Sequence, residues 1–519
     1  MRSRRRDAIE RVEPGGQVTA TGSSGPGASA HADADKLRRN EQHAAAGRNT
    51  VALLLSRLAI ALMGWSGTVL IARLLSPTDW GVFSFVFGLL GMMSIVTDLG
   101  VGRVVLGRLL EADDEDADVF ASSFVGLRAA LGLLGYGIAV GYVVAMGYSG
   151  EVIRATALAG LVVVIATPSH ALSVLYQSRL KMVTVAAAEA FAQLVQLVLT
   201  ILIATTHPGL MIFILPAIAN EIVSGTWKLI GVRRGRVGPR ITRQPRLKLW
   251  REMLVEAIPL SIGLAMMTLL SKIDILMLGK LDQFDSVGLY SVAYKFADVL
   301  SYAVLAIVTP VATLLVAAWP LMTDEFRSRV RSSAVLIGLL TCLAVAGMWA
   351  SGDEVVSLLY GERFGVCADA VRMLLVGAVF AALSHLILVA LVSAARQRAY
   401  PWVAGGALVL NVVLNVYLIP RFSYNGSAGA TVVTEIVMFV AMWVLAARTI
   451  PIDRLMPVAK LLLIVALTVG VCALTDVLQG YVSWVAVAAC AVALFVGGAF
   501  ALRLIDLQLL SRLRRARAV

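Results

Sequence analysis

Residues 71–87, IARLLSPTDWGVFSFVF, align with residues 278–294, LGKLDQFDSVGLYSVAY, at a constant offset of 207 residues. Gly81 meets Gly288 in this alignment. Each stretch joins the end of one apolar segment to the start of the next, so the second half of the chain repeats the first after an even number of crossings. The sequence therefore predicts a parallel repeat, in which two six-helix lobes are related by an axis along the membrane normal.

The composition places this repeat in a membrane. Of the 519 residues, 59% are hydrophobic and 15% are charged, against ~45–50% and ~25% in soluble domains. This excess excludes a soluble enzyme, and apolar runs of about 20 residues match the length of a bilayer-spanning helix. We expect an all-α integral membrane protein with about 14 transmembrane helices, which begin near residues 51, 81, 119, 154, 183, 208, 253, 286, 332, 368, 401, 427, 457 and 481.

The chain also divides into parts along its length. The N-terminal part is rich in Gly, Ala, Ser and Arg without an apolar period, so we expect it to be disordered. The last two apolar segments lie beyond the repeat and form an appended pair. The expected parts are a disordered cytoplasmic tail at 1–48, an N-terminal six-helix lobe at 49–232, a basic cytoplasmic linker at 233–251, a C-terminal six-helix lobe at 252–450, two extra transmembrane helices at 451–505 and a basic cytoplasmic tail at 506–519.

The positive charges predict the orientation in the membrane. If both termini are cytoplasmic, 35 of the 45 Lys and Arg residues fall on the inner side and eight on the outer side. Loops rich in Lys and Arg stay inside, so we place both termini in the cytoplasm. The longest basic loop is expected from Lys228 to Arg251, after the sixth segment. The net charge of +12 thus reflects topology, and no nucleic-acid partner is expected.

Catalytic chemistry has little support in the sequence. A membrane glycosyltransferase or polymerase, the alternative outside transport, needs carboxylates on a sizeable outer loop to activate an acceptor. The longest outer loop, expected at 351–367, has three acidic residues but no His, metal-ligand spacing or nucleophile beside a base. The four cysteines are too scattered for a disulfide framework or a metal site. We therefore expect a transporter with no catalytic residues, no metal and no cofactor.

Four stretches resemble one family of membrane transporters. They are ARLLSPTDWGVFSF (72–85), SKIDILMLGKLDQFDSVGLYSVAYKFADVL (271–300), LLYGERFGVCADAVRMLLVGAVF (358–380) and LNVVLNVYLIPRFSYNGSAGATVVTEIV (410–437). In this order they resemble Wzx-type polysaccharide flippases, a branch of the multidrug/oligosaccharidyl-lipid/polysaccharide exporter superfamily. The resemblance implies a V-shaped, MATE-like fold and transfer of a lipid-linked oligosaccharide from the cytoplasmic to the outer leaflet. It does not explain the long N-terminal tail.

The expected partners and location follow from this resemblance. The substrate is a polyprenyl-pyrophosphate-linked oligosaccharide for cell-surface polysaccharide export, in contact with membrane lipid, and polysaccharide polymerase or assembly proteins are expected nearby. The chain is expected to be a monomer in the bacterial cell membrane. Two alternatives share the fold, a lipid II flippase and a cation-coupled multidrug exporter. The sequence leaves the energy source open, with Asp98, Asp274, Asp298, Glu189, Glu221 and Glu435 as candidate carriers of a coupling ion.

Ionised side chains within the apolar segments are the first candidates for substrate binding. Each costs about 2.5–3.5 kcal/mol at the bilayer centre, so it should face a cavity or a partner. Lys and Arg would hold a pyrophosphate through charge-assisted hydrogen bonds. Snorkelling to the headgroups is an alternative for two arginines, and one Lys–Asp pair can neutralise itself. These candidates are Arg57, Arg128, Lys272, Asp274, Lys295 and Asp298.

A second group of polar residues is suited to sugar binding. Glu189, Gln193 and Gln196 are spaced i, i+4, i+7 on one face of the fifth segment. Asn411 and Asn415 lie one turn apart in the eleventh segment. Hydrogen bonding between helices explains these five residues as well as sugar contact does.

Overall fold

The computed structural model describes residues 56–111, 114–235, 237–241, 246–450, 457–478 and 483–504. These residues are helical and include no strand, which confirms the predicted all-α class. They belong to the compact unit Ser56–Val519, and the other unit, Met1–Leu55, lies outside them. The expected tails at 1–48 and 506–519 also lie outside the described residues, as do parts of the expected pair at 451–505.

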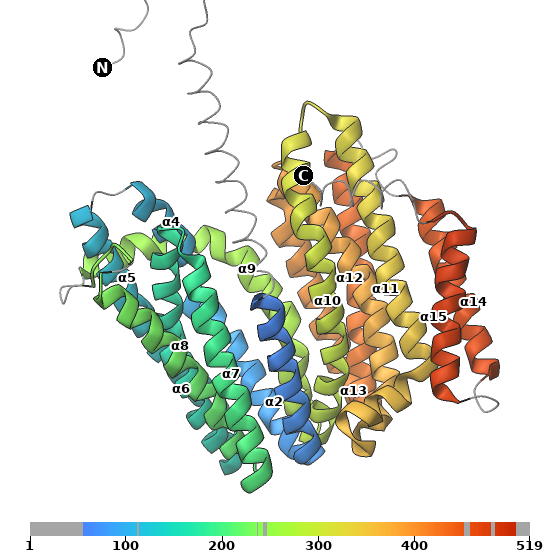
Figure 1. The fold of residues 1–519 in the computed structure, drawn as a ribbon, viewed down its shortest axis with the longest axis horizontal. Coiled ribbons are helices and arrows are strands. Elements are labelled where there is room, and N and C mark those ends of the chain that lie inside the picture. The colour runs from blue at the N-terminus through green and yellow to red at the C-terminus, as the bar shows by residue number, and fades with distance from the viewer. Residues whose placement is uncertain are drawn as a thin grey trace, which may run out of the picture. The chain divides into compact units, whose positions relative to one another are not determined.

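Helices follow one another along the chain with short connections (Figure 1). Local signals set some of their ends. The Ser76 hydroxyl caps α2 by accepting a hydrogen bond from the backbone N–H of Asp79 at 3.0 Å, and Pro77 fits the first turn because its missing N–H is not needed there. The helices are Ser56–Leu74, α2 (Pro77–Met92), α3 (Ser94–Asp98), α4 (Val101–Glu111), α5 (Asp114–Ala145), α6 (Gly150–Ser178), α7 (Met182–Thr206), η1 (Ile212–Ile214), α8 (Leu215–Arg233), α9 (Leu247–Leu281), α10 (Phe284–Ala318), α11 (Thr323–Tyr360), η2 (Glu362–Cys367), α12 (Ala368–Ser393), η3 (Gln397–Ala399), α13 (Tyr400–Thr449), α14 (Val458–Leu478) and α15 (Trp484–Ala501).

The number of membrane-crossing helices agrees with the predicted count. Among the described residues, 11 helices are long and apolar enough to cross a bilayer. α13 counts once there, although the backbone of Ser423 leaves the helical region and divides it in two. That division, together with α8 of 19 residues and α9 of 35 residues, brings the count close to the expected 14. The protein is therefore a multi-pass membrane protein.

The two halves of the repeat meet each other at the start of α2 and α10. A Cβ atom built on Gly81 would lie 1.8 Å from the carbonyl oxygen of Phe284, and one built on Gly288 would lie 2.2 Å from that of Pro77. Only glycine permits this approach of two backbones. The aligned glycines of the sequence repeat are thus in reciprocal contact, and we call this contact the glycine crossing.

Polar contacts close the same end of the molecule. The Thr78 hydroxyl donates to the Asp285 carboxylate, and these two residues are again separated by 207 positions. Nearby, the Ser286 and Ser423 hydroxyls are 2.8 Å apart, which ties the start of α10 to the break in α13. Equivalent positions of the two halves therefore bond across the crossing.

A shared apolar core surrounds the glycine crossing. Phe85 of α2 packs edge-on against Phe284 of α10, with ring centroids 5.5 Å apart, and also contacts Tyr148 at 5.0 Å. Ile275 of α9 lies against Gly88 of α2, where an added Cβ atom would be 3.2 Å from the Ile275 side chain. The buried residues of this core come from both halves of the chain.

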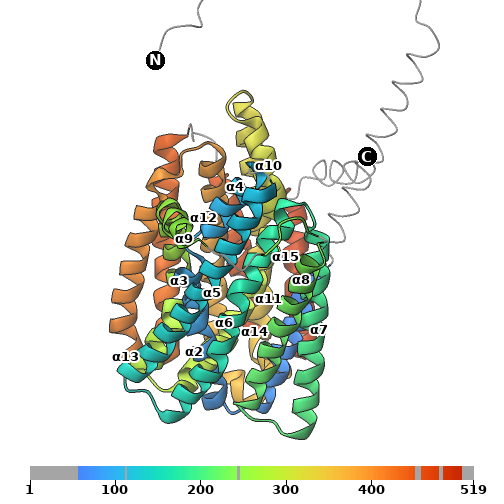
Figure 2. The same cartoon turned by 90° about the vertical axis from the view of Figure 1, so that its left-hand side faces the viewer.

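α9 contacts both the N-terminal helix group, which runs from Ser56 to Arg233, and the C-terminal helix group, which runs from α10 to α13. Its first turns place Met253 and Ala257 in a core with residues of α4 and α5, whereas Leu278 near its end joins the core around the glycine crossing. An ion pair of 2.5 Å between Arg108 of α4 and Glu256 of α9 strengthens the first contact. The basic linker was expected to extend to residue 251, but α9 already begins at Leu247. Figure 2 shows α9 from the side of the N-terminal helices.

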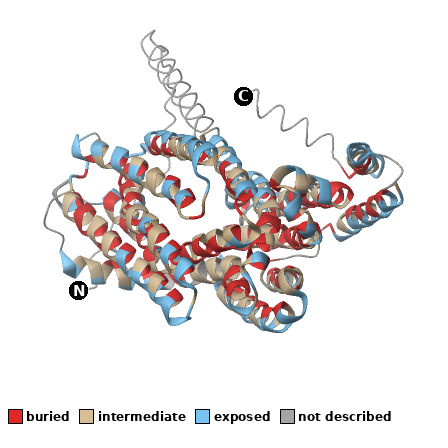
Figure 3. Cartoon of the chain, turned by 90° about the horizontal axis from the view of Figure 1, so that it is seen from below, coloured by how far each residue is buried: buried red, intermediate tan, exposed pale blue. Residues whose placement is uncertain are grey.

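The last two helices form an appended pair. α14 and α15 pack on α11 through a separate apolar core that includes Ala346, Ile464 and Phe495. Figure 1 places this pair on the side of α11 away from α2. Many large apolar side chains elsewhere are exposed, which suits a surface solvated by lipid. Figure 3 shows the exposed residues of every kind in pale blue along the helices.

The glycine crossing generates a stability prediction. We expect Gly81→Ala to lower the thermal unfolding midpoint of the purified protein, because its Cβ would overlap a backbone carbonyl and overpacking costs roughly 1–3 kcal/mol. Gly137→Ala in α5 is the matched control, since nothing lies within 4 Å of its Cβ position and Ala is the better helix former. Equal midpoints for the two variants would contradict the crossing.

Candidate functional site

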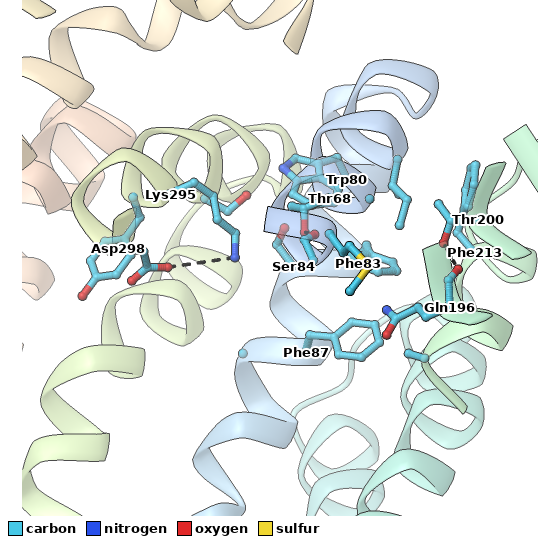
Figure 4. A pocket seen from close by; sticks show the side chains of 18 of the residues that line it. Thr68, Trp80, Phe83, Ser84, Phe87, Gln196, Thr200, Phe213, Lys295 and Asp298 are labelled. Carbon is cyan, nitrogen blue, oxygen red and sulfur yellow. Dashed lines mark hydrogen bonds and ion pairs between the residues drawn. The ribbon is translucent and has the colours of Figure 1, made fainter. Parts of the chain in front are cut away.

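A cavity of about 300 Å³ lies between the two helix groups, beside the glycine crossing (Figure 4). Its walls come from the helix Ser56–Leu74, α2 and α7, with one residue each of η1 and α8, on one side and from α9 and α10 on the other. The volume is at the lower end of the range for small-molecule sites. We call it the central cavity.

One wall of the central cavity is cationic. Lys272 of α9, with Lys295 and Asp298 of α10, lines it. The Lys295 ammonium is 4.0 Å from the Asp298 carboxylate, at the outer limit of an ion pair, and both side chains are about one-third exposed. No ion pair is formed by Lys272 within the described chain. Two ammonium groups against one carboxylate make this wall suitable for an anion.

The facing wall on α2 is aromatic. Trp80, Phe83 and Phe87 lie at i, i+3 and i+7, so they share one face of the helix. Trp80 stacks on Phe83 with centroids 5.4 Å apart, and Phe83 contacts Phe87 at 4.6 Å (Figure 4). The indole N–H of Trp80 is buried and has no hydrogen-bond partner among the described residues. This aromatic stripe was not among the predicted binding residues, although its i, i+3, i+7 spacing is visible in the sequence.

The wall on α7 carries amide and hydroxyl groups. Gln193, Gln196 and Thr200 line the central cavity from this helix. Asn220 of α8 donates to the side-chain oxygens of Gln196 at 2.8 Å and Gln193 at 3.3 Å. This leaves the glutamine NH2 groups as donors for a ligand with hydroxyl or phosphate oxygens. Gly64 brings the first helix against Gln193.

Arg57 and Glu189 form an ion pair, and Lys228 joins it. The Arg57 guanidinium is 3.3 Å from one Glu189 oxygen, and the Lys228 ammonium is 3.4 Å from the other. Lys228 also donates to the Ser169 hydroxyl at 3.4 Å. The charge pattern had assigned Lys228 to the long basic loop, and that was wrong, because Lys228 lies within α8 and is buried. Lys228 lies four residues after Ser224, which is also buried, so the two residues share one buried face of α8.

Arg128 is buried and paired away from the central cavity. Its guanidinium donates to the Asp98 carboxylate at 2.7 Å and to the Thr97 carbonyl at 2.5 Å. Asp98 belongs to α3, the short helix that follows α2. The Arg128 guanidinium is held between helices. It therefore does not line the central cavity, and it does not extend to the lipid headgroups by snorkelling.

Asp274 lies at the centre of a buried hydrogen-bond cluster. One carboxylate oxygen accepts from the Tyr290 and Thr431 hydroxyls, both at 2.8 Å, and the other accepts from the Asn415 amide at 2.8 Å. Asn415 also donates to the Asn411 side chain at 3.0 Å. The cluster links α9 and α10 to both parts of α13. These bonds tie the three helices together, while the side-chain oxygen of Asn415 is buried without a hydrogen-bond partner among the described residues.

A second cavity of about 350 Å³ adjoins this cluster. It lies within the C-terminal helix group, between α9, α10, α12 and α13, and is largely apolar. Asn411, His385 and Glu435 supply polar groups, and Tyr294 belongs to the walls of both cavities.

The eleven predicted binding residues therefore fall into separate groups. The central cavity gathers five of them, namely Lys272, Lys295, Asp298, Gln193 and Gln196. Two others, Arg57 and Glu189, pair with each other. Arg128 pairs with Asp98. The remaining three, Asp274, Asn411 and Asn415, form the buried cluster.

The expected outer loop at 351–367 is helical. α11 continues to Tyr360 with a kink at Ser351, and η2 occupies the rest. The Asp353 carboxylate accepts from Arg372 at 2.5 Å, and Arg372 also pairs with Asp369 at 2.7 Å. Its acidic residues are therefore partly committed to structural ion pairs. The described part of the chain holds no group of three or more His, Cys, Asp or Glu residues placed to bind a metal.

The sequence matches one known protein family over most of the residues described above. The model of the family described as "Polysaccharide biosynthesis protein" matches residues 70–369, more than half of the 519-residue chain. The chain belongs to this family. The residues matched by this polysaccharide biosynthesis family contain α2, α7, α9 and α10. They therefore supply all the walls of the central cavity except most of the first helix. No curated protein matches the sequence.

Solved structures show the fold of this polysaccharide biosynthesis protein in other chains. The lipid II flippase MurJ, in an inward closed conformation, is similar with a TM-score of 0.69 and 13% identity over 87% of this chain and 97% of that one. An inward-facing multidrug resistance MATE family transporter of the MOP superfamily has a TM-score of 0.63 and 15% identity, and the match covers 76% of this chain and 96% of that one. An outward-facing multidrug resistance MATE family transporter has a TM-score of 0.53 and 15% identity, over 77% of this chain and 95% of that one. The predicted MATE-like fold is confirmed.

The Arg128 pair generates a prediction. We expect Asp98→Ala to destabilise this polysaccharide biosynthesis protein by roughly 2–3 kcal/mol, because a buried guanidinium would lose its only carboxylate among the described residues. Asp324→Ala, which removes an exposed i, i+3 pair with Arg327, should cost less than about 1 kcal/mol. Thermal unfolding in detergent measures both, and a loss for Asp98→Ala no greater than that of the control would contradict a structural role.

Proposed function

We propose that this polysaccharide biosynthesis protein is a flippase, which moves a polyprenyl-pyrophosphate-linked oligosaccharide from the inner to the outer leaflet by alternating access. The observation that carries the proposal is the central cavity between the two repeat halves, whose walls combine lysines, amides and aromatic rings. Membership of the polysaccharide biosynthesis family supports the substrate class. The proposed place of action is the bacterial cell membrane, with both termini in the cytoplasm.

The pyrophosphate is the part of the substrate that faces the highest free-energy barrier to crossing the bilayer. Its charge cannot cross the hydrocarbon unaided, since even one ionised group costs several kcal/mol there. Lys272 and Lys295 would replace water around the phosphate oxygens with charge-assisted hydrogen bonds. Because Lys295 is only loosely paired with Asp298, its ammonium hydrogens remain available to the ligand.

The sugars and the lipid would use different surroundings. Gln193, Gln196 and Thr200 offer hydrogen bonds to sugar hydroxyls, and the stripe of aromatic rings on α2 offers an apolar face for the carbon side of a sugar ring. The polyprenyl chain gains about 0.8 kcal/mol for each CH2 kept in hydrocarbon. It therefore stays in the bilayer while the headgroup passes between the helix groups.

The glycine crossing supports alternating access. The crossing and its polar contacts lie at one end of the central cavity, and the positive-inside pattern predicts that this end faces outward. The structure would then be an inward-facing state, which agrees with its greater similarity to the inward-facing than to the outward-facing MATE chain. Opening to the outside requires α2 and α10 to separate at Gly81 and Gly288.

Other functions fit the cavity less well. An exporter of organic cations needs acidic walls, whereas two lysines face one aspartate here. A lipid II flippase shares both the fold and the polyprenyl-pyrophosphate chemistry, so it remains the alternative substrate within the same proposal. We propose a transporter and not an enzyme, acting as a monomer beside polysaccharide polymerase or assembly proteins.

Leaflet exchange tests the proposal. In proteoliposomes with a fluorescent polyprenyl-pyrophosphate-linked oligosaccharide, we expect Lys272→Gln and Lys295→Gln each to slow exchange about tenfold or more, the effect of one lost charge-assisted hydrogen bond. Lys460→Gln on α14 is the control and should exchange at the wild-type rate. No exchange by the wild type, or equal rates for all three variants, would remove the proposal.

A cross-link tests alternating access separately. Thr78→Cys combined with Asp285→Cys, in a chain whose four native cysteines are replaced by Ala, places two thiols where the side chains now touch. We expect oxidation to stop leaflet exchange and reduction to restore it, because the cross-link holds the crossing closed. Thr78→Cys alone should be insensitive to oxidant. Full exchange by the cross-linked protein would show that this end does not open.

A further inference from the structure

Arg57 and Glu189 lie on the two helix faces that line the central cavity. Gly64 is seven residues after Arg57 on the first helix, and Gln193 is four residues after Glu189 on α7, so each pair shares a helix face. Gly64 and Gln193 are in contact and both line the central cavity. The Arg57–Glu189 pair therefore lies farther along the same two walls, toward the end of the cavity away from the glycine crossing, and we call this end the mouth.

The two cations that share Glu189 differ in burial. Arg57 contacts one carboxylate oxygen with a side chain that is 55% exposed. Lys228 contacts the other oxygen with a side chain that is 2% exposed. An exposed arginine exchanges partners readily, because water and other anions compete for it. A buried ammonium does not, since leaving its carboxylate would leave the charge without solvent or partner.

This asymmetry decides what happens when a phosphate reaches the mouth. The guanidinium fork of Arg57 matches phosphate oxygens and can leave Glu189 for them. Glu189 is not stranded by that exchange, because Lys228 still neutralises it and Ser169 holds Lys228 in place. Glu221, two turns before Lys228 on α8, is another carboxyl within electrostatic range of Lys228 and Glu189. Without Lys228, Glu189 would have Arg57 as its only cation partner in this cluster.

We propose that Lys228 is a positioning residue that holds Glu189 and so lets Arg57 pass from this carboxylate to a phosphate of the lipid-linked substrate. The inference rests on the proposed flippase function and adds a receiving position for phosphate at the mouth of the central cavity. Lys228 itself touches no substrate. It sets how strongly Glu189 competes with the phosphate for Arg57.

Binding of radiolabelled undecaprenyl pyrophosphate to the full-length protein in phosphatidylcholine nanodiscs tests this. We expect Arg57→Ala and Lys228→Met each to raise Kd about tenfold, the effect of losing one charge-assisted hydrogen bond. Adding Glu189→Gln to Lys228→Met should restore Kd to within about threefold of wild type, because Arg57 then has no competing carboxylate. In the Arg57→Ala background, Lys228→Met should cause no further loss.

Each other result overturns the inference. A merely structural role for Lys228 would leave the double variant as weak as Lys228→Met, and additive losses in the Arg57→Ala background would place Lys228 on a separate path. If Lys228→Met does not fold, Glu189→Gln alone decides, since it should bind at least as tightly as wild type and weaker binding refutes the idea. Wild-type binding that is insensitive to Arg57→Ala removes this inference only, whereas no wild-type binding removes the proposed function as well.

Discussion

A charge inside a membrane must have a partner or face water, and this constraint organises the structure. Arg128 forms an ion pair with Asp98, and Lys228 forms one with Glu189, so both cations are fixed between helices. Lys272 and Lys295 satisfy the constraint in a different way, because they line a cavity. The same physical requirement thus separates charges that hold helices together from charges that remain available for a ligand.

The contact between the two repeat halves and the cavity lined by the lysines lie next to each other. Reciprocal contact between Gly81 and Gly288 brings the two helix groups together at one end, and the central cavity lies directly beside that contact. A larger residue at either glycine would force the two backbones apart at this end. A single close approach therefore sets where the two helix groups meet and where the cavity between them begins.

Prediction from sequence succeeded where a feature depended on the chain's own periodicity. Apolar segments near residues 284 and 458, for example, are long enough that only a helix satisfies their backbone in a bilayer. It was less successful with individual polar residues. Lys228 has a loop-like charge context but a buried position, and residues 351–367 have a loop-like composition but are helical. Burial depends on which neighbouring helix covers a residue, and that information lies elsewhere in the chain.

The helical membrane class, the approximate number of crossings and the repeat could be predicted from the sequence, because each follows from hydropathy and spacing within a segment. It is the packing of the helices that makes Asp274, Asn411 and Asn415 bond to one another, while Gln193 and Gln196 face a cavity with Lys295. All of these residues look alike in sequence, as polar groups in apolar helices. The rotation of each helix against its neighbours, set by packing over the whole bundle, assigns one to a hydrogen-bond network and another to open space.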